Sequence, residues 1–179
     1  MGGLTNNRTA ALVAAAVTIV LVAVVALKSG KDKPAPAPAA PNPPAPVSAS
    51  ELKGLSTSLR QPVYWAGPQG ATKFELTRAG ADRISVRYPA APGANPAQGT
   101  LTVATYRLPD ATAAVRRAGG APTAKLYKMR NSGLAVLDNA RPTNVYFAYP
   151  NEPFQVEVFD PAPGRALKLV LGGRVKPVR

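Results

Sequence analysis

Lysine and arginine are the most numerous reactive side chains in this chain, with 22 of them against 9 Asp and Glu and a formal net charge of +13. Strand-like alternation puts Arg83 and Arg87 on one polar face, with a further arginine nearby across a predicted hairpin. Such clusters are typical either of a surface that contacts a polyanion or of a face that only meets water. The candidates for polyanion contact are Arg78, Arg83, Arg87, Lys125, Lys128 and Arg130.

A short aromatic segment, Tyr64-Trp65, contains the only Trp of the chain. Both side chains are candidates for stacking on a sugar or a base, together with the aromatic residues of segment 146–149. A place in the hydrophobic core is the favoured alternative, because a single Trp in a small domain commonly anchors the core. No aromatic RNA-binding motif accompanies the basic residues, so nucleic acid is not an expected partner.

The chain contains no His and no Cys, which excludes His-dependent triads, imidazole metal sites, disulfides and zinc–thiolate sites. Any catalysis would have to rely on carboxylates, amines, hydroxyls and backbone groups. Most acids fall at predicted helix starts, in turns or on exposed strand faces, and only Asp138 has no evident structural role. No nucleotide-binding or nucleophile motif is present. We therefore expect no catalytic residue, no metal and no cofactor. An envelope enzyme that uses carboxylates is the alternative, and it requires a second acid beside Asp138 in a cleft.

Residues 9–27 contain no charge, Gly or Pro and are flanked by Arg8 and Lys28. As a helix this segment would span about 28 Å, close to the thickness of a bilayer's hydrocarbon core. A cleaved signal peptide is the alternative, but its apolar segment is usually shorter and ends near a small-residue cleavage site. We expect an uncleaved transmembrane helix at 9–27, preceded by a tail of residues 1–8.

Two further parts follow the apolar segment. Residues 28–49 form a Pro/Ala-rich linker in which seven of the thirteen residues 34–46 are Pro, a composition typical of an extended polyproline spacer. Residues 50–179 are predicted to form a single globular domain. This domain carries 18 Lys and Arg against 8 Asp and Glu, a net charge of +10. Most of the positive charge therefore belongs to the domain.

The residue patterns of the domain indicate the α+β class. Short helices are expected at 50–59 with Ser50 as the cap, at 110–118, and after Asp160. Consecutive strands joined by short turns favour a mainly antiparallel sheet, with two or three short helices on one face. The predicted strands are 63–66, 72–78, 83–88, 101–108, 124–129, 134–138, 145–149 and 154–159.

The orientation of the membrane anchor is the point on which the sequence signals disagree. Three lysines at 28–33 follow the apolar segment and only Arg8 precedes it, which favours a cytosolic domain by the positive-inside rule. A tail of eight residues and a Pro-rich spacer favour an N-terminal signal anchor with the domain outside the cell. The absence of Cys is compatible with an oxidising exterior. We expect an extracytoplasmic domain.

The expected protein is a single-pass membrane protein that is held in the lipid bilayer by residues 9–27 and carries a non-catalytic binding domain. Its Ala-, Val-, Pro- and Arg-rich composition is similar to that of envelope proteins from bacteria with GC-rich genomes. The expected partners are an anionic envelope polymer, lipid head groups or another envelope protein. A membrane-tethered cytosolic domain that binds polyanions is the alternative, and it requires the opposite topology.

Overall fold

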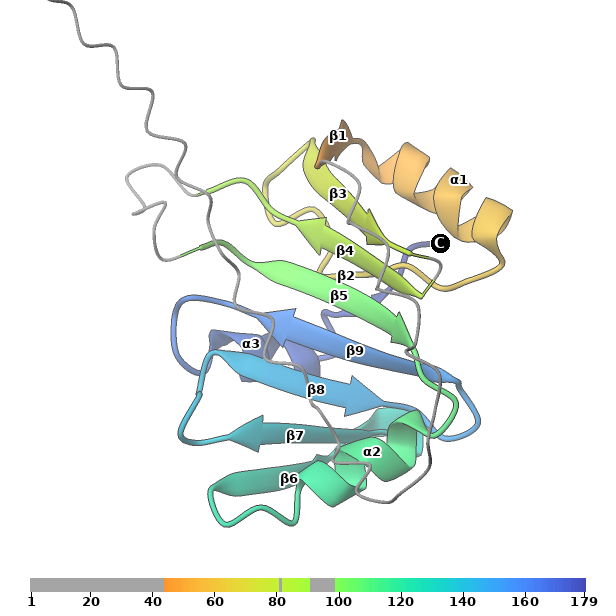
Figure 1. Cartoon of the computed structure of the whole chain (residues 1–179). Coiled ribbons are helices and arrows are strands. Elements are labelled where there is room, and N and C mark those ends of the chain that lie inside the picture. Colours follow the sequence, from red (N-terminus) through yellow and green to blue (C-terminus); the bar gives the residue numbers. More distant parts are fainter. Residues whose placement is uncertain (1–43, 81, 91–98) are drawn as a thin grey trace, which may run out of the picture. The chain divides into compact units, whose positions relative to one another are not determined.

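Residues 44–80, 82–90 and 99–179 are described by a computed structural model (Figure 1). The predicted transmembrane helix at 9–27 and residues 28–43 of the predicted linker lie outside this described part. Within it, no helix is both long enough and apolar enough to cross a membrane. The elements are β1 (Ala45–Val47), α1 (Ala49–Leu59), β2 (Tyr64–Trp65), β3 (Phe74–Ala79), β4 (Arg83–Arg87), β5 (Thr102–Arg107), α2 (Ala111–Ala118), β6 (Ala124–Lys128), η2 (Arg130–Ser132), β7 (Leu134–Asp138), β8 (Asn144–Ala148), β9 (Phe154–Phe159), α3 (Arg165–Leu171) and β10 (Lys176–Pro177).

Eight strands form one antiparallel sheet in the order β1-β3-β4-β5-β9-β8-β7-β6, and β2 pairs with β10 in a second, two-stranded sheet. In Figure 1 a first meander, β3 to β5, and a second meander, β6 to β9, meet at β5 and β9. At this junction Thr105 pairs with Val156. The described domain thus has three helices and a large antiparallel sheet, and the predicted α+β class is confirmed.

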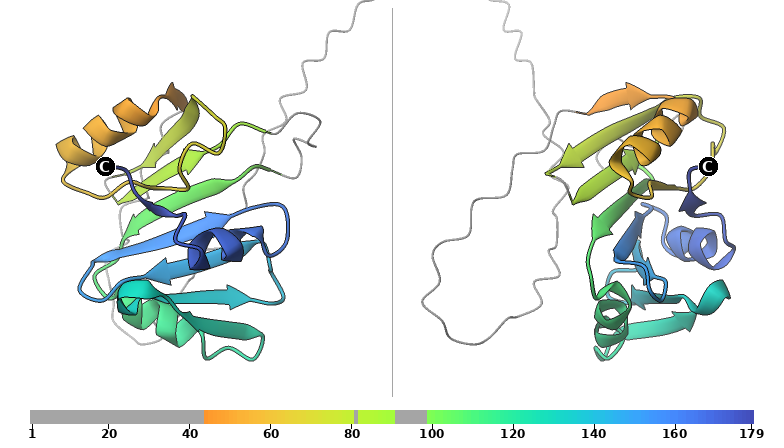
Figure 2. Two further views of the ribbon diagram at one scale, coloured as in Figure 1. Left: turned by 180° about the vertical axis from the view of Figure 1, so that it is seen from behind. Right: turned by 90° about the vertical axis from the view of Figure 1, so that its right-hand side faces the viewer.

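Helices cover both faces of the large sheet. α1, α3, β2 and the two valines that flank β10, Val175 and Val178, contribute to the main hydrophobic core on one face, which we call the core face; the fully buried Phe147 of β8 belongs to it. α2 packs on the other face, the α2 face, where Val115 meets Val136 and Ala148. Figure 2 shows α2 and α3 on opposite sides of the sheet. The prediction that the helices share one face is wrong for α2, because β7 and β8 carry apolar side chains on both faces.

The domain begins earlier in the chain than the sequence predicts. Ala45–Val47, at the end of the predicted linker, form β1 and pair with β3. Pro46 is accommodated because β1 is an edge strand, where a missing N–H costs no hydrogen bond. Ser48 rather than Ser50 caps α1: the Ser48 hydroxyl accepts from the Glu51 N–H, and the Glu51 carboxylate accepts from the Ser48 N–H at 2.6 Å. The last residues of the predicted linker therefore belong to the domain.

Residues near position 178 complete the core. β10 pairs with β2, and the Val178 N–H donates to the Val63 carbonyl at 2.9 Å; both side chains are buried. Tyr88 anchors the segment after β2, since its hydroxyl accepts from the Ala66 N–H at 2.7 Å and donates to the Gly67 carbonyl at 2.8 Å. Neither β1 nor β10 is predicted from the sequence, because strands of two or three residues are too short for alternation to be recognised.

Candidate binding surface

The first predicted cation cluster is divided between the two faces of the sheet. Arg83 and Arg87 lie on the α2 face of β4, as alternation predicts, because Ile84 between them belongs to the core. Arg78 pairs with Ile84 across β3 and β4 and so lies on the core face. Side chains of neighbouring strands share a face when their residues pair directly. Arg78 therefore does not join the surface formed by Arg83 and Arg87.

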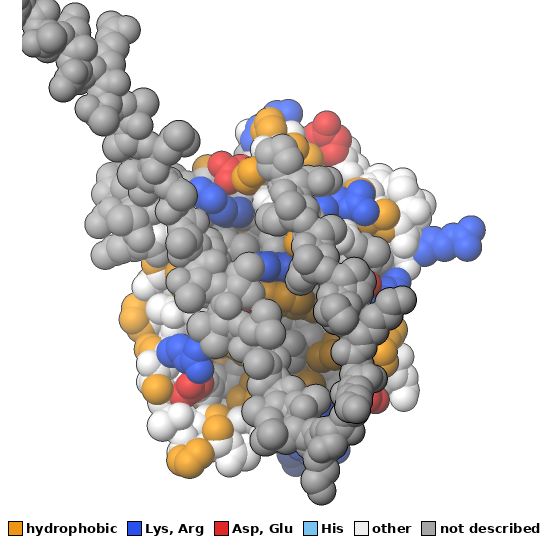
Figure 3. Space-filling view, viewed as in Figure 1, with side chains coloured by type: hydrophobic (Ala, Val, Ile, Leu, Met, Phe, Trp, Pro, Cys, Tyr) orange, Lys and Arg blue, Asp and Glu red, His pale blue; other side chains and the backbone are white. Residues whose placement is uncertain are grey.

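Both arginines of the α2 face have partners. The Arg87 Nε lies 3.3 Å from the Glu75 Oε2, but their side chains are 43% and 44% exposed, so this ion pair contributes little. The Arg83 guanidinium lies over the Tyr106 ring, 5.3 Å from its centroid. In Figure 3 the visible Lys and Arg side chains of this face are scattered among apolar and acidic ones. Among the side chains that Figure 3 leaves visible, the cations do not gather at one point.

A carboxylate network lies in the middle of the α2 face, on β5, β9 and β8. The Glu157 Oε2 accepts from the Tyr106 hydroxyl at 2.5 Å, and its Oε1 accepts from the Tyr146 hydroxyl at 3.1 Å and the Asn144 side-chain amide at 2.9 Å. Burial, followed by the negative charge of Glu157, raises the pKa of both Tyr106 and Tyr146. Alternation along 154–159 predicts Glu157 on an exposed strand face, but no local pattern indicates this network, because Tyr106 and Glu157 are 51 positions apart.

The raised tyrosine pKa values predict a loss of stability at alkaline pH. Burial raises the pKa of Tyr88 to about 12, from an ordinary value near 10. The folded state favours the neutral Tyr88 hydroxyl. The contribution of this hydroxyl to the free energy of unfolding is therefore fully present below about pH 10 and is lost as the pH rises toward about 12. We expect the urea midpoint, followed by circular dichroism, to fall above about pH 10. The variant Tyr88→Phe should fall less steeply; an identical fall would contradict the role of this hydroxyl.

The second predicted cluster lies on β6, an edge strand of the sheet, and in the turn after it. Lys125 is on the core face, where its Nζ lies 5.3 Å from the Tyr127 ring centroid, whereas Lys128 is on the α2 face. Arg130 follows in η2, and all three cations are exposed. Residues 111–137 contain no Asp or Glu. We call Lys125, Lys128 and Arg130 the basic edge, since no acid neighbours them in the sequence.

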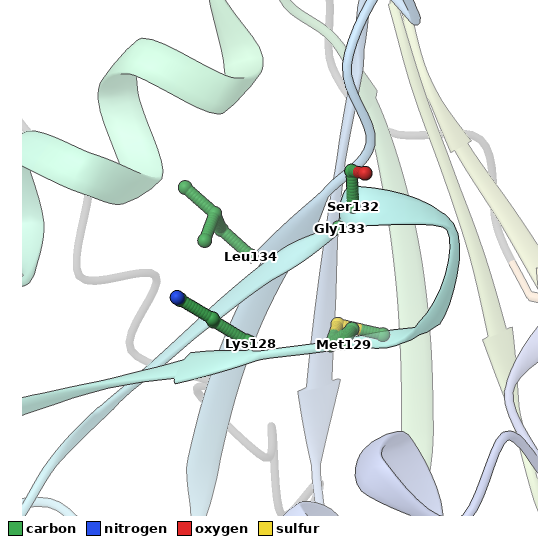
Figure 4. Close-up of a pocket in the computed structure, with 5 residues that line it drawn as sticks. All are labelled: Lys128, Met129, Ser132, Gly133 and Leu134. Carbon is green, nitrogen blue, oxygen red and sulfur yellow. The ribbon is translucent and has the colours of Figure 1, made fainter.

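A shallow depression of about 390 Å³ lies beside the basic edge, at the turn between β6 and β7 (Figure 4). In Figure 4 the Lys128 and Leu134 side chains point to the same side of the hairpin. The turn has a defined backbone, because Asn131 takes the left-handed conformation at φ 53°. A Cβ on Gly133 would lie 2.7 Å from the Cε1 of Tyr149, so the aromatic ring packs directly on this glycine. The Tyr149 ring thus supports the turn that follows β6.

The two stacking candidates have packing roles. The Tyr64 ring is 2% exposed and meets Phe147 edge to face, with centroids 5.7 Å apart, and its hydroxyl donates to the Glu152 Oε2 at 3.0 Å. Trp65 is half-buried and meets Phe74 edge to face at 5.6 Å. A ring that is 2% exposed cannot stack on a ligand from solvent. Tyr64 is therefore a core residue, as the favoured alternative predicts, and not a stacking residue.

Asp138, which has no evident role in the sequence, shapes the turn after β7. Its carboxylate accepts from the Ala140 N–H at 2.9 Å and lies 3.5 Å from the Arg141 Nε. Hydrogen bonds from Thr123 and Ala140, together with the charge of Arg141, lower the pKa of Asp138. These contacts give this carboxylate a structural function at the β7–β8 connection.

Asp160 is the most buried acid of the described part and does not cap a helix directly. α3 begins at Arg165, four residues after the predicted start at Pro161. The Asp160 Oδ1 accepts from the Ala162 N–H at 2.9 Å, and its Oδ2 lies 3.4 Å from the Arg165 Nε. The carboxylate thus fixes the turn that leads into α3.

The structure places three of the six polyanion candidates at one edge of the sheet and two on the α2 face, and it separates the sixth from both groups. Arg83 and Arg87 share the α2 face, Arg78 lies on the core face, and the basic edge lies at the opposite margin of the sheet. Compared with protein-family models, with curated proteins and with solved structures, the chain matches none of them.

Proposed function

We propose that this chain is a membrane-anchored, extracytoplasmic, non-catalytic binding protein of a bacterial cell envelope, whose basic edge binds an anionic partner. The apolar segment 9–27 and the Pro-rich linker support the anchor and the distance from the membrane. The positive charge of the domain supports an anionic partner, such as a phosphate-bearing envelope polymer or an acidic envelope protein.

The observation that carries the proposal is the excess of cations without an acidic partner. Within the described part, only Arg87, Arg141 and Arg165 form ion pairs, out of 18 Lys and Arg from residue 50 onward. The basic edge lies in an acid-free part of the chain and is exposed to solvent. Exposed and unneutralised cations attract anions over several ångströms, which increases both the rate and the strength of association.

The acids of the domain support binding over catalysis, because six of the eight have structural partners. Glu51 bonds Ser48 in the α1 cap, and Glu75 pairs with Arg87. Each of the other four accepts hydrogen bonds from a neighbouring residue: Asp138, Glu152, Glu157 and Asp160. A general acid or base needs an oxygen that is free to reach a substrate proton. The six carboxylates with partners instead form hydrogen bonds and ion pairs within the domain.

Neutralising the basic edge should weaken binding to a phosphate polymer. The probe is fluorescent inorganic polyphosphate, titrated into the full chain in a neutral detergent and followed by anisotropy. For Lys125→Gln/Lys128→Gln/Arg130→Gln we expect about tenfold weaker binding. The slope of the logarithm of the binding constant against the logarithm of salt concentration should become less steep by about one for each lost contact. The matched control is Lys53→Gln/Lys168→Gln/Arg174→Gln, which removes the same charge from three other exposed positions. Equal losses in the two variants would contradict a localised site.

The topology can be tested with reporters attached after Arg179. A flexible linker should precede each reporter, because the nearby Val178 is buried. We expect an alkaline-phosphatase fusion to be active and a green-fluorescent fusion to be dark, since each reporter matures on only one side of the membrane. The reverse result would place the domain in the cytosol and overturn the extracytoplasmic part of the proposal.

A further inference from the structure

The two edges of the large sheet differ in how open they are. At one edge β1 has three residues and contains Pro46, which removes one backbone donor. At the other edge β6 has five residues and no Pro, and all of them are exposed or half-exposed. Edge strands carry unpaired N–H and C=O groups that can pair with another extended chain. β6 is therefore the edge at which a further strand can be added.

The register identifies which backbone groups of β6 are free. The Met129 N–H donates to the Gly133 carbonyl at 2.8 Å, and β6 and β7 pair in the same antiparallel register. Hydrogen-bonded positions alternate along such a pair, so the odd-numbered residues of β6 bond to β7. The N–H and C=O groups of Leu126 and Lys128 consequently point away from β7. Two donors and two acceptors are available on this edge.

The side chains of β6 add a pattern of charge and apolarity. Leu126 is 40% exposed, and within the described part only it and Leu171 are large apolar side chains with this exposure. Leu126 pairs with Val136 and so lies on the α2 face, whereas Lys125 lies on the core face. A strand added to this edge would meet Leu126 and Lys128 on the α2 face and Lys125 on the core face.

We propose that β6 binds an extended acidic segment of a partner protein as an added strand of the sheet, with acidic side chains against the basic edge and an apolar side chain against Leu126. Backbone hydrogen bonds to Leu126 and Lys128 supply the pairing, and the charges supply the selectivity. This inference rests on the proposed function and names the partner of the basic edge. It identifies the partner as a peptide and not a phosphate polymer.

Charge favours an acidic partner over a second copy of this chain. Pairing β6 with β6 of another copy would bring two basic edges, six exposed cations in all, to one interface. Like charges at an interface reduce affinity unless they are compensated. Lysines on an edge strand also discourage self-pairing in natural sheets. An acidic strand turns the same lysines into favourable contacts.

The test uses the full chain in neutral detergent and a short fluorescent peptide of alternating Glu and Val. We expect the peptide to bind, and the same peptide with a central Val replaced by Pro to bind at least about tenfold more weakly, because it loses a backbone donor. Leu126→Pro should weaken peptide binding by at least a similar factor, about tenfold, since it removes an edge N–H. Leu126→Ala, which keeps the N–H, should retain most of the binding.

Polyphosphate binding separates the failure of this inference from that of the proposed function. Leu126→Pro should leave polyphosphate binding unchanged, because the three cations remain. Polyphosphate binding without peptide binding, or peptide binding that ignores Leu126→Pro, overturns the added strand and leaves the proposed function standing. A wild-type dimer that becomes monomeric in Leu126→Pro also overturns it, in favour of a second copy.

A second measurement keeps the test valid if Leu126→Pro does not fold. In the wild-type chain, the peptide should slow hydrogen exchange at the amides of Leu126 and Lys128, which point to the free side. Protection elsewhere in the sheet with no change at these two amides would contradict pairing at this edge.

Discussion

Replacing Phe147 by Ala is expected to lower the free energy of unfolding by about 3–5 kcal/mol. Phe147 is 0% exposed, and its ring meets Tyr64 and Tyr149 edge to face at centroid distances of 5.7 and 5.9 Å. The substitution removes these contacts and leaves a cavity under β8 that neighbouring strands cannot fill without strain. Urea unfolding of the full chain, followed by the fluorescence of the single Trp65, gives the loss directly.

Phe159→Ala is the control for the Phe147 prediction. Phe159 is a half-buried phenylalanine of β9 on the α2 face, so its truncation should cost less. Equal losses for the two variants, or a loss below about 1 kcal/mol for Phe147→Ala, would contradict a role of Phe147 at the centre of the core.

Removal of the Glu157 carboxylate is the second large effect. Glu157→Ala leaves the Tyr106 and Tyr146 hydroxyls and the Asn144 amide without their acceptor. We expect a loss of about 2–3 kcal/mol in the same urea assay, because each part-buried donor has to find water or remain unpaired. Tyr106→Phe and Tyr146→Phe should each cost about 1 kcal/mol, and their effects should not add, since both hydroxyls share one carboxylate.

Glu75→Ala is the matched control for Glu157. It removes the same side chain from the same face of the sheet, but its ion pair with Arg87 is exposed, so the expected cost is below about 1 kcal/mol. If Glu157→Ala costs no more than Glu75→Ala, the network contributes nothing to stability beyond an ordinary surface contact.

Local sequence patterns predicted the strands well and the long-range arrangement poorly. Residues 134–138 and 154–159 are strands with the predicted bounds, because alternation is a property of a few neighbouring residues. The same alternation put Arg83 and Arg87 on one face correctly. It could not assign Arg78 to a face relative to them, because that depends on which residues of β3 and β4 pair.

The Glu157 network joins residues that are distant in the sequence, so local patterns could not predict it. Tyr106, Tyr146 and Glu157 meet because β5, β9 and β8 are adjacent, and strand order is set by packing of the whole sheet. The prediction that Ser50 caps α1 is wrong for a local reason. Ser50 directly precedes Glu51, whereas Ser48 lies three residues before it, and only the spacing of three residues allows the reciprocal bonds of a capping box.

The pairing of β10 with β2 has a consequence for the timing of folding. Val178 and Val63 are 115 positions apart, yet they hydrogen-bond to each other and both lie in the core. In a chain that emerges N-terminus first, this part of the core is completed only when residue 178 arrives, because contacts of high sequence separation form late. The C-terminal segment is therefore expected to complete the hydrophobic core as the last step of folding.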